Sequence, residues 1–129
     1  MACLAFGSSM VAVDQFVFQS QNGPVTIKLL LDANITKQRG VDAIVNPANE
    51  TLIGQAGVSL AIQNAAGQEL IDHILNLACK DFTKGLCPIG EYRITPAFNL
   101  QNTMGNKYII HVVGPRNSTP NRKTLLSNI

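Results

Sequence analysis

The chain alternates short apolar runs with longer segments whose apolar residues recur at helical spacing. Residues 25–31 form an apolar run between turn residues, which predicts a strand. Residues 43–46 are too short and too uniformly apolar for an alternating strand, so they predict a buried strand of a covered sheet. Residues 107–113 predict another apolar strand, and residues 90–98 alternate in part, as a strand does.

Two segments have the period of an amphipathic helix. In residues 58–66 apolar side chains fall at i, i+3, i+4 and i+7, which predicts a helix with one apolar face. Gly67 interrupts this pattern, and the period resumes over residues 69–78. A turn region is expected at residues 99–106, and the first turn of a helix at residues 124–126. Strands that alternate with helices predict an α/β domain whose sheet is covered on both faces.

Composition adds limits to this picture. The chain has 129 residues, which suits one domain. Residues 1–24 are rich in polar residues and breakers and are interpreted as a leader with an edge strand at residues 16–18, whereas residues 25–129 form the domain. Charged residues make up only 14% of the chain, against about a quarter in a typical protein, so some surface is uncharged or covered by more protein. The net charge of +2 is too small to indicate a specific nucleic-acid partner.

The cysteines and the N-terminus exclude several classes of protein. The three cysteines form no CxxC pair and show no metal-ligand spacing with the two histidines, so neither a disulfide framework nor a metal site is expected. No basic residue precedes Lys28, whereas a secretory signal has a positive n-region. No stretch approaches the length of a membrane span. We therefore expect a cytoplasmic or nuclear protein that is not secreted and has no membrane partner.

Polar turns follow two of the predicted strands. Asn34 lies in the turn after the first, and Asn49 follows the second, before a loop with Gly54 and Gly57 and a helix that starts near Val58. Glycines let backbone N–H groups approach an anion, and a helix N-terminus adds positive potential, so this loop is a candidate phosphate cradle. It has neither the Gly-Lys-Ser/Thr of a P-loop nor a GxGxxG fingerprint. The alternative is an ordinary loop that its asparagines cap or pin.

Several segments resemble one family in order and spacing. Residues 41–49, V-D-A-I-V-N-P-A-N, resemble the V-D-A-I-V-N-A-A-N signature of macrodomains, which are ADP-ribose-binding modules. The segments A-A-G-Q-E-L at residues 65–70, C-P-I-G-E at 87–91 and K-Y-I-I-H-V-V-G-P at 107–115 are similar to later family motifs. The resemblance covers about residues 25 to 115. It implies a three-layer α/β fold with a mixed central sheet, and recognition of free or protein-linked ADP-ribose as a ligand, without a cofactor.

The resemblance also implies a ligand site. Asn34 and Ile35 match the segment that binds adenine, with Asn34 in place of an aspartate, so its amide oxygen accepts the bond without charge; the alternative is a turn asparagine. Asn49 matches the residue that contacts the distal ribose, or it pins the loop. Backbone N–H groups of Gly57 and Val58 match positions that meet the diphosphate. The implied ADP-ribose site comprises Asn34, Ile35, Ala48, Asn49, Gly54, Gly57 and Val58.

The candidate catalytic position is Ser59, where hydrolytic relatives have an aspartate. A serine hydroxyl is no base near neutral pH without a partner, so Ser59 is expected to cap the helix and no catalytic residue is assigned. His111 is expected in the core, and His73 on the helix surface or in packing. Hydrolysis of ADP-ribosyl proteins or of O-acetyl-ADP-ribose stays the alternative function, and a non-binding remnant or interaction module is a third.

The family has further strands and helices after the G-P segment. The sequence therefore predicts a macrodomain cut short, with its last strands and helices missing. Strands left without neighbours expose backbone groups and apolar faces. We expect a poor autonomous fold that can self-associate through the exposed sheet.

Overall fold

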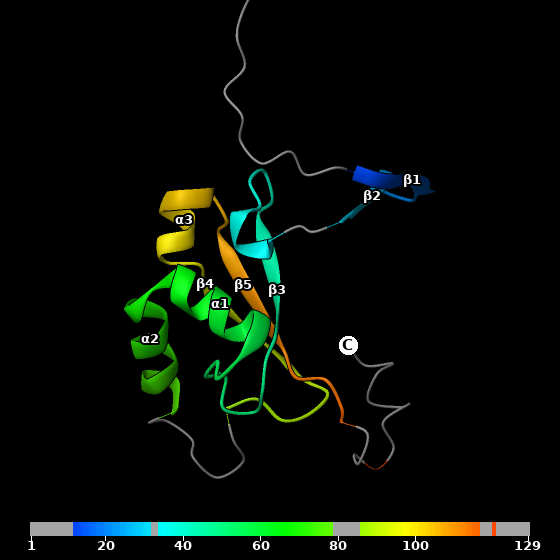
Figure 1. Cartoon of the computed structure of the whole chain (residues 1–129). Coiled ribbons are helices and arrows are strands. Elements are labelled where there is room, and N and C mark those ends of the chain that lie inside the picture. The colour runs from blue at the N-terminus through cyan, green and yellow to red at the C-terminus, as the bar shows by residue number, and fades with distance from the viewer. Residues whose placement is uncertain (1–11, 32–33, 79–85, 117–119, 121–129) are drawn as a thin grey trace, which may run out of the picture. The chain divides into compact units, whose positions relative to one another are not determined.

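The computed structural model describes residues 12–31, 34–78, 86–116 and 120. The chain divides into two compact units, Met1–Asn34 and Ile35–Ile129 (Figure 1). The helical turn expected at residues 124–126 lies outside the described residues.

The first unit contains an antiparallel hairpin. Strand β1 (Ala12–Ser20) pairs with β2 (Gly23–Leu30) through a two-residue turn, and Ser20 faces Gly23. The Ser20 hydroxyl donates to the Gly23 carbonyl at 2.7 Å, which closes the turn. The strand expected at residues 25–31 is confirmed, and the edge strand expected at 16–18 is part of a longer one. The greater length brings in Gln15 and Gln19, the polar residues that flank the apolar run Phe16-Val17-Phe18.

The hairpin has one apolar face. Phe16 pairs with Ile27 and Phe18 with Val25, and Leu29 continues the same face. These five side chains are all about half exposed. The opposite face is mixed: it carries Gln15, Gln19, Thr26 and Lys28 together with the apolar Val17, Pro24 and Leu30. The polar side chains of the hairpin are therefore concentrated on one face.

The second unit is a mixed three-stranded sheet with helices. The strand order is β3 (Ala43–Pro47), β5 (Tyr108–Val112), β4 (Tyr92–Pro96), with β3 parallel and β4 antiparallel to β5. The helical elements are η1 (Ile35–Lys37), α1 (Gly57–Ala66), α2 (Gln68–Ala78) and α3 (Asn99–Met104). The expected α/β class with a mixed sheet is thus confirmed. The turn expected at residues 99–106 instead begins with α3.

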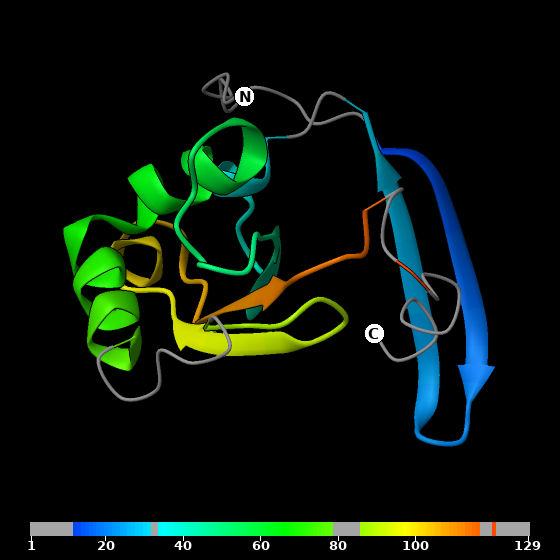
Figure 2. The same cartoon turned by 90° about the horizontal axis from the view of Figure 1, so that it is seen from below.

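The helices lie on one side of this sheet (Figure 1 and Figure 2). Ile44 and Ile109 point from the sheet into a core that also holds Ile62, Leu70 and Leu100 of the helices. On the other face of the sheet, side chains are exposed, among them Val45, Tyr92, Ile94 and Tyr108. The expectation of a sheet covered on both faces is therefore met on one face only within the described residues.

His111 links all three strands inside the core. Its side chain is completely buried, as expected. Asn46 Nδ2 on β3 lies 3.0 Å from Nδ1 of His111, and Thr95 Oγ1 on β4 lies 3.0 Å from Nε2. Burial lowers the pKa of the His111 imidazole from 6.5 to about 4, so the ring is neutral at physiological pH. A neutral ring has one donor and one acceptor, so Asn46 donates to Nδ1 while Nε2–H donates to Thr95.

This buried imidazole predicts a pH-dependent stability. Below pH 6.5 the unfolded chain takes up a proton at His111, and the folded chain does not until about pH 4. The free energy of unfolding therefore decreases as the pH is lowered through that window. The free energy of unfolding should drop by about 2 kcal/mol between about pH 8 and about pH 5. Urea denaturation at several pH values measures it.

Two substitutions separate this effect from other titrations. His111→Gln should flatten the slope, because no proton uptake remains at that position. His73→Gln is the matched substitution at the other histidine, a partly exposed residue whose ring centroid lies 5.6 Å from that of Phe98. An unchanged slope in His111→Gln would show that another group is responsible.

Candidate functional site

A cavity of about 430 Å³ lies where β3 and β5 end. The two strands are parallel, so their carboxyl ends meet at one edge of the sheet, the usual place for a ligand in such sheets. Its lining comes from the segment after β3, from the start of α1 and from the segment after β5. The lining residues are Pro47, Ala48, Asn49, Glu50, Gln55, Ala56, Ser59, Val112, Val113, Gly114, Pro115 and Arg116.

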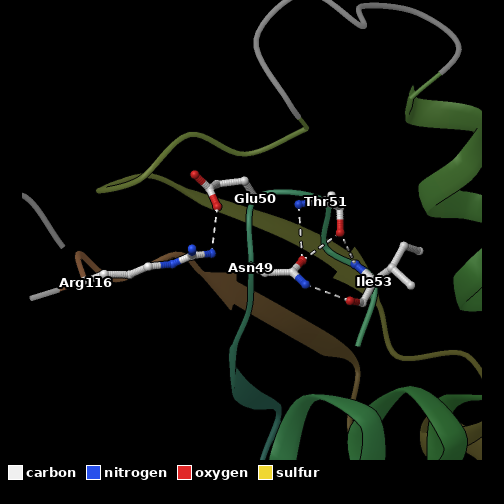
Figure 3. A network of polar contacts seen from close by, with 5 residues as sticks. All are labelled: Asn49, Glu50, Thr51, Ile53 and Arg116. Atoms are coloured by element: carbon white, nitrogen blue, oxygen red, sulfur yellow. Dashed lines mark hydrogen bonds and ion pairs between the residues drawn. The ribbon is translucent and has the colours of Figure 1, made fainter. Parts of the chain in front are cut away.

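Asn49 holds the loop after β3 in shape (Figure 3). Its Oδ1 accepts hydrogen bonds from the Thr51 backbone N–H at 3.2 Å and from the Thr51 hydroxyl at 2.8 Å. Its Nδ2 donates to the Ile53 carbonyl at 3.0 Å. These bonds match the alternative in which Asn49 pins the loop. They use both acceptor positions and one of the two N–H groups, so one donor of the amide has capacity for a ligand.

The pinned loop also contains a residue in an unusual backbone conformation. Leu52 has φ of 61° and is 2% exposed, and its N–H donates to the Asn49 carbonyl at 3.0 Å. A leucine in the left-handed region costs about 1 kcal/mol or more unless the surroundings hold it there. Two features stabilise Leu52 in this conformation: its side chain is buried in the core, and Asn49 hydrogen-bonds to the loop around it.

Gly54 lies behind the cavity rather than in its lining. It is buried, and its N–H donates to Oε1 of Gln63 on α1 at 2.8 Å. A Cβ at this position would lie 2.7 Å from the Ser59 carbonyl carbon and 2.8 Å from the Leu60 nitrogen. Glycine at position 54 is therefore what lets the loop lie directly against α1.

Helix α1 begins beside the cavity. Its N-cap is Ala56, which has no side-chain cap, and Gly57 follows with φ of 59°. Ser59 lies in the first turn of the helix and lines the cavity, so the expectation that it caps the helix is wrong. The reason is that the helix begins earlier than expected, at Gly57. Gly57 and Val58 are exposed, next to the lining residues.

An ion pair crosses from the loop after β3 to the segment after β5. Nη2 of Arg116 lies 3.2 Å from Oε2 of Glu50. Neither residue was expected at the site from the sequence. The signal for Arg116 was its position directly after the G-P segment that ends a strand parallel to β3, since parallel strands end at the same edge.

The expected ligand residues thus fall in different places. Ala48 and Asn49 line the cavity. Gly57 and Val58 adjoin it, Gly54 supports it, and Ile35 is partly buried against the core in η1. Asn34 belongs to the first unit.

Other chemistry is limited in the described part of the chain. No group of three or more His, Cys, Asp or Glu side chains there could hold a metal ion. Cys87 is buried in the core, and burial raises the pKa of its thiol. None of the described helices is long and apolar enough to cross a membrane.

The contact between Gly54 and α1 predicts a selective loss of stability. Gly54→Ala places a methyl group against backbone atoms that cannot rotate away, so the free energy of unfolding should fall by about 1–3 kcal/mol. Gly114→Ala is the matched control, because a Cβ there meets nothing within 4 Å. Its effect should stay within about 1 kcal/mol. Equal melting temperatures for the two variants would contradict this account of Gly54.

Comparison with known proteins agrees with this arrangement. The family model for the Macro domain matches residues 45–129. An uncharacterized protein of Fusobacterium nucleatum is 48% identical over 90 residues, which are 70% of this chain and 45% of that protein. A macro domain-containing protein of Methanosarcina mazei is 46% identical over 86 residues, which are 67% of this chain and 40% of that protein. The chain thus spans somewhat less than half the length of these curated relatives.

Solved structures give the same family. The Oceanobacillus iheyensis macrodomain with ADP is similar at a TM-score of 0.70 and 32% identity, over 89% of this chain and 57% of that one. A point mutant of the same macrodomain, with ADPR, is similar at the same TM-score. The macro domain of ganglioside induced differentiation associated protein 2 reaches a TM-score of 0.51 at 28% identity. Because the family model covers more than half of its residues, the chain belongs to the Macro domain family.

Proposed function

We propose that this protein binds ADP-ribose, free or attached to a protein, in the cavity at the carboxyl ends of β3 and β5. The observation that carries the proposal is the cavity itself, lined by Ala48 and Asn49, two residues of the site that the family resemblance implies. The similar Oceanobacillus iheyensis structures contain ADP and ADPR, which supports a ligand of this class.

The groups around the cavity suit a nucleotide sugar. The second N–H of the Asn49 amide can donate to a ribose hydroxyl, and the Ser59 hydroxyl and the Gln55 amide add further polar atoms. Uncapped N–H groups at the start of α1, at Gly57 and Val58, favour a diphosphate. Cβ atoms at Gln55 and Ala56 narrow this loop compared with a run of glycines, so we expect weaker binding than in glycine-rich relatives.

Several parts of the proposal come from the sequence alone. Asn34 and Ile35 are the proposed adenine contacts. A mono-ADP-ribosylated protein is the proposed macromolecular partner, and a cytoplasmic or nuclear location stays a prediction. Self-association is proposed through the exposed sheet face of Val45, Ile94 and Tyr108.

Titration calorimetry with ADP-ribose, ADP and AMP tests the function. Asn49→Ala should weaken ADP-ribose binding by about tenfold, because it removes the donor to the ligand and the bonds that shape the loop. Thr51→Val separates these effects: it removes the hydroxyl bond to Asn49 Oδ1 but keeps the Asn49 amide. It should weaken binding less than Asn49→Ala.

Two results would contradict the assignment. Absence of heat with all three nucleotides would reject ADP-ribose binding and favour a non-binding interaction module. Equal affinities for the wild type and Asn49→Ala would remove Asn49 from the site while leaving the function in place.

Hydrolysis is the second candidate, and one observation bears on it. Glu50 supplies a carboxylate to the described cavity lining, but its Oε2 is paired with Arg116. No histidine is among the described lining residues that could serve Ser59 as a general base, so we expect release of ADP-ribose from an ester-linked substrate to stay at background. Chromatographic detection of free ADP-ribose measures this. Turnover that is abolished by either Ser59→Ala or Glu50→Gln would instead establish an enzyme.

A further inference from the structure

The ion pair between Glu50 and Arg116 lies at the cavity (Figure 3). Glu50 follows Asn49 directly, in the loop after β3. Arg116 follows Gly114-Pro115, after β5. In Figure 3 the Arg116 side chain extends across to Glu50, beside the loop that Asn49 holds. The pair therefore joins two of the segments that line the cavity.

Charge in the lining is concentrated in this pair. Among the described residues around the cavity, Arg116 carries the positive charge and Glu50 the negative charge. The other lining side chains are neutral. The side-chain charge that an anion meets in the cavity thus depends on how these two side chains are engaged.

The ion pair between Glu50 and Arg116 is weak enough for another anion to displace Glu50. The side chains of Arg116 and Glu50 are 69% and 40% exposed, and water screens an ion pair in such a setting, so separating the charges costs little. The guanidinium is a planar fork of N–H donors that fits phosphate oxygens in pairs, and a phosphate offers more charge than one carboxylate. A phosphate group in the cavity can therefore replace Glu50 as a partner of Arg116.

We propose that Arg116 is an anion-binding residue of the cavity and that Glu50 is its internal competitor. A diphosphate takes the Arg116 guanidinium from Glu50, and the released carboxylate turns to solvent. Glu50 thereby lowers the affinity of the cavity for every anion. A ligand needs more negative charge to bind Arg116 than it would need without Glu50. The diphosphate as occupant rests on the proposed function, whereas the competition itself does not.

A second exposed ion pair in the same unit provides a matched control. Nζ of Lys107 lies 2.8 Å from Oδ1 of Asp42, with side chains 59% and 78% exposed. These residues precede β5 and β3, so they lie at the opposite end of the same two strands from the cavity. Asp42→Asn removes the same charge as Glu50→Gln without touching the cavity lining.

Inorganic pyrophosphate is the probe, because it has neither adenine nor ribose. Calorimetric titration of the whole chain compares the wild type with Glu50→Gln, Arg116→Gln, the double variant and Asp42→Asn. Glu50→Gln should bind pyrophosphate about two- to fivefold more tightly, which corresponds to the release of one exposed ion pair. Arg116→Gln should bind about five- to twentyfold more weakly than the wild type. The double variant should behave as Arg116→Gln does, and Asp42→Asn as the wild type does.

The proposal is overturned if Glu50→Gln binds no more tightly than the wild type, or if the double variant keeps the gain. It is also overturned if Asp42→Asn gains as much, since the effect would then reflect net charge. The same variants titrated with ADP-ribose keep the two proposals apart. The predicted pyrophosphate order without any ADP-ribose binding would support the anion site and reject the proposed function. If substitutions at Glu50 and Arg116 leave the affinity for ADP-ribose unchanged, the proposed function is supported and the anion site is rejected.

Discussion

The parallel pairing of β3 with β5 is the constraint on which the second unit depends. The register runs from Ala43 opposite Tyr108 to Pro47 opposite Val112, and one further bond, from Ala48 N–H to the Val112 carbonyl at 2.9 Å, extends it past the last pair. Both strands therefore end at one level. The segments that follow them emerge side by side, although they are far apart in sequence. Without that coincidence there would be no cavity.

A buried polar network makes this register specific. A slip of one residue would turn every side chain on a strand to the other face of the sheet. It would move His111 away from Asn46 and Thr95, and leave buried polar atoms without partners. Apolar contacts such as that of Ile44 with its neighbours are less selective, because one aliphatic side chain substitutes for another with a smaller penalty. The network thus adds specificity that burial of apolar area does not.

Most of the elements could be predicted from the sequence, because apolar period and glycine boundaries are local signals. β3, α1 and α2 lie within one or two residues of their expected ranges. Local patterns could not give the ion pair of Glu50 with Arg116, since it depends on the register of two strands. Nor could they show that Gly54 serves helix packing, because a glycine that approaches a ligand and one that approaches a helix look the same in sequence.

Leu52 shows how two opposing demands restrict a single position. Its left-handed backbone favours glycine or asparagine, whereas its place in the core favours a large aliphatic side chain. Glycine would relax the backbone but leave a void, and asparagine would bring an amide into an apolar site. No amino acid satisfies both demands, so leucine is a compromise whose backbone strain the loop must bear. The set of residues that evolution accepts at this position should therefore be narrow, and narrower than at core sites in regular strands or helices.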